Sequence, residues 1–232
     1  MPPLTPPKNN SAPRGEHLLN ADSVEHSALL TEVAGYYAEK LALHGDSPQG
    51  VDWNGLESQV LRFAQIEKII ANESAFSVND LGCGYGAFFE YLQKSHTNYS
   101  YLGVDVSAQM IHAARQRYAR AANARFILGA EAGSVTDYGV ASGIFNVRHG
   151  RSDTQWRSYL EDTLDVLDRS SRLGFAFNCL SLYSDADKRR DYLYYADPCL
   201  LFDLCKRRYA KNVALLHDYG LYEFTILVRK SP

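Results

Sequence analysis

The chain has no apolar run near the roughly 20 residues that a membrane-spanning helix requires, and its N-terminus lacks the charged and apolar regions of a signal peptide. We therefore expect a cytoplasmic protein without a membrane partner. Cysteine is scarce and scattered: the four residues contain no Cys-x-x-Cys pair, which argues against a zinc site or a disulfide framework. No tight grouping of carboxylates and histidines occurs either, and we predict no metal.

Neither sign of charge predominates: 24 basic and 27 acidic residues are mixed along the chain and leave a net charge of -3. This balance gives no reason to expect nucleic acid as a partner, and small or neutral substrates fit better. A chain of 232 residues with 46% hydrophobic residues can bury one sizeable core. Oligomeric state is left open by these features.

Proline is concentrated at the start of the chain, where residues 1–15 hold five of the eight prolines. Such a composition cannot bury enough apolar surface to fold, so we predict a disordered tail over 1–15. Apolar residues at helical spacing then predict helices over 23–43 and 56–70, with a break at 44–48. We expect residues 16–72 to form a helical cap.

From about residue 73 onward, short apolar runs alternate with helical patterns. The predicted strands are 75–80, 101–104, 125–128, 138–144, 173–177, 213–217 and 222–228. Repeated strand and helix units predict a doubly wound α/β fold with a mostly parallel seven-stranded sheet. The short link between the last two strands permits only an antiparallel hairpin. Residues 73–232 should form one compact unit with the cap.

A glycine-rich loop follows the first predicted strand and precedes a helix. Gly82, Gly84 and Gly86 have no side chains, so a ligand can approach the backbone closely. Asp105 ends the second predicted strand about 20 residues later, where a carboxylate can accept both hydroxyls of a ribose. The stretch from Gly82 to Ala87 also fits the dinucleotide pattern Gly-x-Gly-x-x-Ala, so an NAD(P)-dependent oxidoreductase is an alternative.

The segment from Asp80 to Gly86, Asp-x-Gly-x-Gly-x-Gly, resembles the first motif of class I S-adenosylmethionine-dependent methyltransferases, and the similarity extends over about residues 56–230. The resemblance implies S-adenosylmethionine as cofactor, with Asp80 at its ammonium group and Asp105 at its ribose. It also implies an acidic residue after the third strand that binds the adenine amino group. Glu131 is the candidate here, one position later in the sequence than is usual in the family. The remaining donor-binding candidates are Val106, Met110 and Ser142.

The stretch around Arg62 looks like that of small-molecule enzymes of the trans-aconitate methyltransferase kind, in which an Arg from this helix reaches the donor carboxylate. We carry that role to Arg62, although a surface arginine of a helix is an equal alternative. The expected function is methyl transfer to a small-molecule O or N acceptor. Nucleobase-amine enzymes usually carry Asn/Asp/Ser-Pro-Pro-Tyr/Phe after the fourth strand, and residues 142–146 do not match it.

Candidate residues for the acceptor site lie near the ends of the later strands. A neutral histidine can serve as a base near pH 7, and tyrosine and tryptophan can line a pocket, although ordinary packing explains such residues equally well. The catalytic candidates are His217, His149 and Tyr195. The substrate-binding candidates are Tyr37, Trp53, Phe145, Asn146, Tyr194 and Tyr219.

Two further hypotheses concern how the site is used. Since no base is unambiguous, a protein that binds the donor without catalysis is an alternative to an enzyme. The two N-terminal helices also precede the first strand, and a parallel sheet binds ligands at the carboxyl ends of its strands. We therefore expect these helices to act as a movable lid in which Tyr36, Tyr37, Trp53 and Arg62 help to close the site. Permanent packing on the sheet is the alternative.

Overall fold

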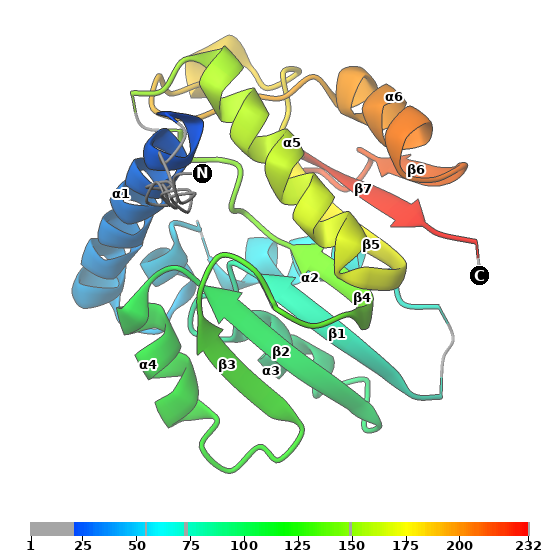
Figure 1. Cartoon of the computed structure of the whole chain (residues 1–232). Helices are drawn as coiled ribbons and strands as arrows, with labels where there is room; N and C mark the ends of the chain where they lie inside the picture. The colour runs from blue at the N-terminus through cyan, green and yellow to red at the C-terminus, as the bar shows by residue number, and fades with distance from the viewer. Residues whose placement is uncertain (1–20, 54, 72–73, 149, 232) are drawn as a thin grey trace, which may run out of the picture.

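A central seven-stranded sheet organises the chain, with strand order β3-β2-β1-β4-β5-β7-β6 (Figure 1). The computed structural model describes residues 21–53, 55–71, 74–148 and 150–231, and it describes residues 21–26 by their backbone alone. The tail predicted over 1–15 lies outside the described residues. None of the helices in these ranges is long and apolar enough to cross a membrane.

Helices and strands alternate through most of the chain. The strands are β1 (Phe76–Leu81), β2 (Tyr99–Asp105), β3 (Ala124–Leu128), β4 (Thr136–Ala141), β5 (Ser171–Leu180), β6 (Asn212–Leu216) and β7 (Glu223–Arg229). The α-helices are α1 (Ala21–His44), α2 (Leu56–Glu67), α3 (Ala87–Leu92), α4 (Ala108–Arg117), α5 (Asp153–Arg169) and α6 (Pro198–Arg208). Two 3-10 helices, η1 (Pro48–Val51) and η2 (Ala186–Lys188), complete the list.

The predicted doubly wound sheet with a C-terminal antiparallel hairpin is confirmed. Strands β1 to β5 pair in parallel, and β7 runs antiparallel to both β5 and β6. The central strands β1 and β4 are buried along most of their length, and β1 buries the polar residues Asn79 and Asp80 beside apolar ones. The end of β4 differs from the prediction: the strand stops at Ala141 and not at residue 144, because Gly143 takes a positive φ of 82° and turns the chain away from the sheet.

Each face of the sheet is covered by its own hydrophobic core. On one face, α2, α3 and α4 contribute Phe63, Phe89 and Ile111 to a cluster with the strands. On the other, α5 and α6 contribute residues such as Leu160 and Leu201. Burial of these apolar side chains supplies most of the stabilisation of the fold.

The connection from β3 to β4 contains no helix. Residues 129–135 cross the face of the sheet as an irregular segment, visible in Figure 1 as the green loop below α5. Ala132 is buried against the same core as α5, whereas Val135 is exposed. A connection between parallel strands usually carries a helix, so the space beside α5 on this face is enclosed only by a thin segment.

Helix α1 lies across the edge where the parallel strands end (Figure 1). It packs against η1 and α4. Tyr36 donates a hydrogen bond to Asp52 at 2.6 Å, and Lys40 pairs with the same carboxylate at 2.6 Å. Glu32 pairs with Arg151 in the loop before α5 at 2.6 Å. Helix α1 is therefore tied to both sides of the carboxyl edge.

The start of α5 depends on a capping box. Ser152 accepts a hydrogen bond from the Gln155 amide at 3.3 Å, and the Gln155 side chain accepts one from the Ser152 amide at 3.0 Å. We predict that Ser152→Ala lowers the free energy of unfolding by about 1 kcal/mol, because an amide of the first turn loses its partner. Denaturant titration measures this difference. Thr154→Ala, an exposed change in the same turn, is the control, and equal effects of the two substitutions would contradict the prediction.

Candidate functional site

The glycine loop leaves β1 and turns under the end of β2. Gly82 and Gly84 have positive φ angles of 73° and 54°, which residues with side chains rarely adopt. The Gly82 amide donates to the Val104 carbonyl at 2.8 Å, which joins the loop to β2. A Cβ atom on Gly84 would lie 3.1 Å from Val51 in η1. The loop therefore presents its backbone, and not side chains, to the space above it.

Asp105 ends β2 beside this loop, and its carboxylate is held by backbone amides. One oxygen accepts from the Gly84 amide at 2.9 Å, and the other accepts from the Ser107 amide at 2.8 Å. Burial raises the pKa of Asp105 above its ordinary value even though these hydrogen bonds act to lower it. The side chain is thus fixed in direction and has lost much of its hydration, so hydroxyl donors of a ligand can satisfy it.

Asp80 is a second buried carboxylate, located one strand away in β1. It is 2% exposed and accepts a hydrogen bond from the Tyr101 hydroxyl. Burial raises the pKa of Asp80 to about 7; the charge of Asp105 adds to this effect, and Tyr101 opposes it. A cationic ligand group at this position would compensate the desolvated charge.

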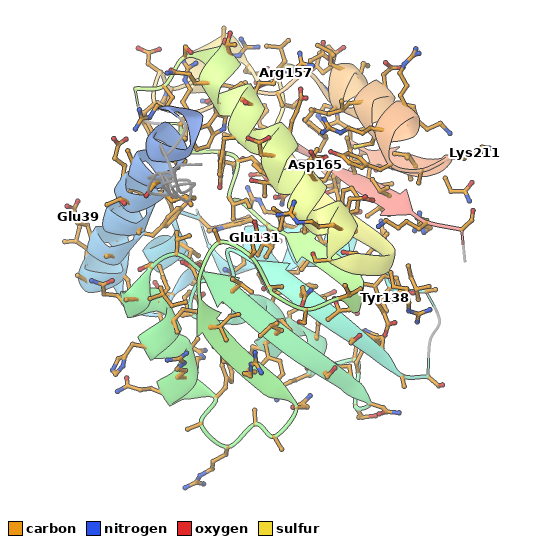
Figure 2. All side chains as sticks on the ribbon, viewed as in Figure 1. Glu39, Glu131, Tyr138, Arg157, Asp165 and Lys211 are labelled. Atoms are coloured by element: carbon orange, nitrogen blue, oxygen red, sulfur yellow. The ribbon has the colours of Figure 1, made fainter. Side chains whose placement is uncertain are left out.

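A cavity of about 260 Å³ lies above the loop, between the carboxyl ends of the strands and helices α1 and α5. Leu30, Val33 and Tyr37 of α1 cover it. In Figure 2, Glu131 on the β3–β4 connection and Asp165 on α5 mark two further parts of its wall. Of the residues predicted from the sequence, the cavity lining contains Gly82, Gly84, Asp105, Val106, Met110, Glu131, Ser142, Tyr37 and Trp53.

A smaller cavity of about 40 Å³ adjoins the loop on the α2 side. Asp80 lines it together with Gln59 and Tyr85, whose side chains lie 3.5 Å apart. Trp53 lines both cavities. The two carboxylates predicted from the sequence therefore lie at neighbouring hollows along one edge of the sheet.

Arg62 lines neither cavity. The residue is 8% exposed. Its guanidinium pairs with Glu223 at 2.7 Å, donates to the Ser58 carbonyl at 3.0 Å and stacks on Trp53 at 4.0 Å from the ring centroid.

Gly86 also lies outside both cavity linings. An added Cβ there would lie 2.6 Å from Tyr118, so Gly86 permits close packing of the loop on the core.

Several predicted acceptor-site residues are engaged in packing and not in the cavity lining. Phe145 is fully buried against Tyr159 and Phe177. Asn146 accepts a hydrogen bond from the Leu180 amide at 3.2 Å. Both residues therefore connect the loop after β4 to the core beneath it.

The other candidates among the described residues line neither cavity. Tyr194 packs against the core under α5 and α6, and the Tyr195 hydroxyl accepts from the Arg190 amide at 2.9 Å. The Tyr219 hydroxyl lies 3.1 Å from that of Thr225. His217 is exposed at the end of the edge strand β6, where its ring contacts Tyr183 and Phe224. His149 lies outside the described residues.

Other wall residues were not predicted from the sequence. Tyr159, Thr163 and Val166 line the cavity from one face of α5. Their helical spacing indicates a common face, but the same spacing is typical of core residues. Gln59 and Tyr85 line the smaller cavity; Gln59 belongs to no motif, and Tyr85 occupies a variable position of the glycine loop. Within the described residues, no group of three or more His, Cys, Asp or Glu side chains could hold a metal ion.

Comparison with known proteins points to one family. The family model described as "Methyltransferase domain" matches residues 78–172, from β1 into β5. A protein of Mycobacterium tuberculosis strain H37Rv, named "Putative methyltransferase Rv1506c", is 60% identical over 164 residues, which cover 71% of this chain and 99% of that protein. The matched region of the family model includes the glycine loop and Asp105.

Solved structures share the fold at low sequence identity. The N-methyltransferase NodS of Bradyrhizobium japonicum, in complex with S-adenosylhomocysteine, is 18% identical with a TM-score of 0.61 and covers 86% of this chain and 98% of its own. The complex of DhpI with S-adenosylhomocysteine is 14% identical with a TM-score of 0.59, covering 89% and 98%.

The raised pKa of Asp80 has a consequence for stability. Between about pH 4 and pH 7 the folded protein keeps a proton on Asp80 that the unfolded chain releases, so the free energy of unfolding falls as the pH rises through this window. Asp80→Asn has no such proton. We predict that its stability relative to the wild type increases from pH 4 to pH 8, by on the order of 2 kcal/mol.

Denaturant titration of the ligand-free protein across this pH range measures the difference. Asp162→Asn, which changes an exposed carboxylate on α5, is the control and should follow the wild type. If the wild type and Asp80→Asn lose stability in parallel as the pH rises, Asp80 does not carry the raised pKa.

Proposed function

Because the chain belongs to the methyltransferase family of its mycobacterial relative, we propose that it binds S-adenosylmethionine across the two adjoining cavities and methylates a small-molecule O or N acceptor. The observation that carries the proposal is the pair of buried carboxylates, Asp80 and Asp105, that flank a glycine loop at adjacent strand ends. Two chemically different ends of one ligand can be recognised there.

The residues fit the donor at its nucleoside end. The Asp105 carboxylate is held by the Gly84 and Ser107 amides and can still accept the two ribose hydroxyls. Val106, Met110 and Ile144 give the cavity apolar surface suited to an adenine ring. Glu131 lies on the same wall, although it also pairs with Arg169 at 2.6 Å.

At the amino-acid end, Asp80 can receive the ammonium group beside Gly82. Bound there, the donor supplies a methyl group on a sulfonium, and transfer is an in-line displacement. The protein's contribution is to align the acceptor and to exclude water. Leu30, Val33 and Tyr37 of α1 already cover the cavity on the solvent side. The methyl group would be delivered toward the loop after β4, where Ser142 and Gly143 form the wall.

The same residues are a poor fit for a nicotinamide dinucleotide. A pyrophosphate is bound by backbone amides at a helix N-terminus, and a buried carboxylate beside that loop would repel it. Asp80 occupies that position, whereas it attracts the ammonium of S-adenosylmethionine. Titration calorimetry with S-adenosylhomocysteine, NADH and NADPH tests this preference. Binding of either nicotinamide cofactor without binding of S-adenosylhomocysteine would contradict the proposal.

Turnover separates an enzyme from a protein that only binds the donor. We expect the chain to consume S-adenosylmethionine when the correct small-molecule acceptor is supplied in a metabolite screen that detects S-adenosylhomocysteine. Nucleic acid should not act as an acceptor, since acidic and basic residues are mixed along the chain and the net charge is -3. Transfer to nucleic acid in the same screen would contradict the choice of acceptor class.

We predict that Asp105→Ala weakens S-adenosylhomocysteine binding by about 1–3 kcal/mol, because charge-assisted hydrogen bonds to the ribose are lost. Asp105→Asn keeps one acceptor oxygen and should lie between the alanine variant and the wild type. Calorimetry on folded variants gives the three affinities. Equal affinity of all three proteins would remove Asp105 from the donor site.

We also predict that α1 and α2 close over bound donor. Tyr36, Tyr37 and Trp53 lie on the covering segments, and Arg62 stacks on Trp53 from α2. Hydrogen exchange with and without S-adenosylhomocysteine should show added protection over residues 29–63. Protection confined to residues 82–86 would indicate that α1 and α2 are packed permanently and do not move as a lid.

A further inference from the structure

An ion pair lies buried behind one wall of the cavities. Arg62 of α2 and Glu223 of β7 are joined at 2.7 Å, with side-chain exposures of 10% and 3%. Among the ion pairs in the described part of the chain, no other has both side chains so inaccessible. Burying two charges costs several kcal/mol per ion before their attraction is counted. A pair placed at such a cost beside a ligand cavity is a candidate for a functional role.

The position of Glu223 in the sheet brings it to the acceptor side of the site. Glu223 begins β7 opposite Leu180, and Thr225 stands opposite Asn178. Because alternate residues share a face, Glu223, Thr225 and Asn178 lie on the α2 side of the sheet. Asn178 accepts a hydrogen bond from the Gly143 amide at 2.7 Å, and Gly143 lines the larger cavity.

One aromatic side chain stands between the pair and the cavities. Trp53 lines both cavities, and its ring carries the Arg62 guanidinium at 4.0 Å. A Cβ added to Gly143 would lie 2.7 Å from the same indole, so Trp53 rests directly on the loop after β4. Glu223 itself lines neither cavity, and an approach to it from the cavities would require this one side chain to move.

Glu223 interacts electrostatically with a residue of the cavity wall. Burial is the main cause that raises the pKa of the Tyr37 hydroxyl, and the negative charge of Glu223 is among the contributions that add to it. Tyr37 lines the larger cavity. A charged group of a ligand in that cavity would therefore also experience the field of Glu223.

One oxygen of Glu223 has accepting capacity left. Oε2 accepts from Arg62 at 2.7 Å, whereas among the described residues Oε1 accepts from the Asn146 side-chain amide alone, at 3.4 Å. That second contact is long for an N–H···O hydrogen bond. A carboxylate oxygen can accept more than one hydrogen bond, so Oε1 can receive an N–H of a ligand.

From this arrangement we infer that the methyl acceptor is an amine and that Glu223 faces its nitrogen; the inference rests on the proposed function. The amine enters as a neutral base after it has released a proton to solvent. Its lone pair forms the new N–C bond while the C–S bond breaks and its electron pair stays on sulfur. The positive charge thereby moves from sulfur to nitrogen, and the Glu223 carboxylate stabilises the ammonium formed.

A carboxylate is better suited to this role than to hydroxyl chemistry. Methylation of an alcohol requires removal of its proton, and a carboxylate, with an ordinary pKa near 4, is far too weak a base for that task. Methylation of an amine instead creates a cation, which a fixed negative charge stabilises directly. Arg62 pairs with Glu223 at 2.7 Å and holds its carboxylate in place.

The donor analogue sinefungin tests the inference without knowledge of the acceptor. In sinefungin, a carbon that carries a primary amine replaces the sulfur and its methyl group, so an ammonium stands where the methyl would be. We expect wild-type protein to bind sinefungin more tightly than S-adenosylhomocysteine. Glu223→Gln should reduce this preference about three- to tenfold while leaving S-adenosylhomocysteine affinity within a factor of two, since one charge-assisted contact is lost.

Matched variants separate this effect from a loss of folding. Glu67→Gln changes a carboxylate that is paired with His96 at 2.7 Å and lines neither cavity, and it should keep the wild-type preference. If Glu223→Gln does not fold because Arg62 is left without its partner, Arg62→Met with Glu223→Met removes both charges and should show the same loss. Glu223→Asp, which retains the carboxylate, should keep part of the preference.

The outcomes distinguish this inference from the proposed function. Wild-type protein that binds neither sinefungin nor S-adenosylhomocysteine would contradict the proposed function itself. Wild-type protein that binds both, with a ratio that the folded Glu223 variants leave unchanged, would overturn the inference and leave donor binding intact.

Discussion

The hydrogen bond from the Gly84 amide to the Asp105 carboxylate is the interaction on which the site depends. It forms where Gly84 takes a positive φ of 54°, a backbone conformation that residues with side chains rarely adopt. It also fixes the carboxylate, which receives the Ser107 amide on its other oxygen. Loop and carboxylate thereby form one rigid unit, and the cavity takes its shape from that unit.

Several buried charged groups surround this unit. Asp80, Asp105 and the Arg62–Glu223 pair all lie near the ends of strands at one edge of the sheet. Desolvation raises the pKa of Asp80 and of Asp105, which means that burial of their charged forms destabilises the ligand-free fold. The two apolar cores on the faces of the sheet offset this cost. The apolar cores therefore stabilise a fold that carries destabilising charged groups at its ligand site.

Local sequence signals were sufficient for the fold and for the proximity of the glycine loop and Asp105. The pattern of apolar residues indicated the seven strands and the two N-terminal helices, and the spacing from Gly82 to Asp105 placed loop and acid together, because both signals act over short distances along the chain. Wall residues such as Thr163 were missed, since nothing local separates them from core positions. Arg62 and Glu223 are 161 residues apart, and only the completed sheet brings them together. Sequence spacing could not reveal that Arg62 already has a partner.

We propose that Asp105 and Asp80 recognise the two ends of S-adenosylmethionine. A crystal structure of the chain with S-adenosylhomocysteine is the decisive test. We expect both ribose hydroxyls within hydrogen-bond distance of the Asp105 carboxylate, with the amino-acid ammonium beside Asp80 and Gly82. A ligand that lies elsewhere, or one whose ribose is held by other residues while Asp105 remains bound only to Gly84 and Ser107, would contradict this assignment.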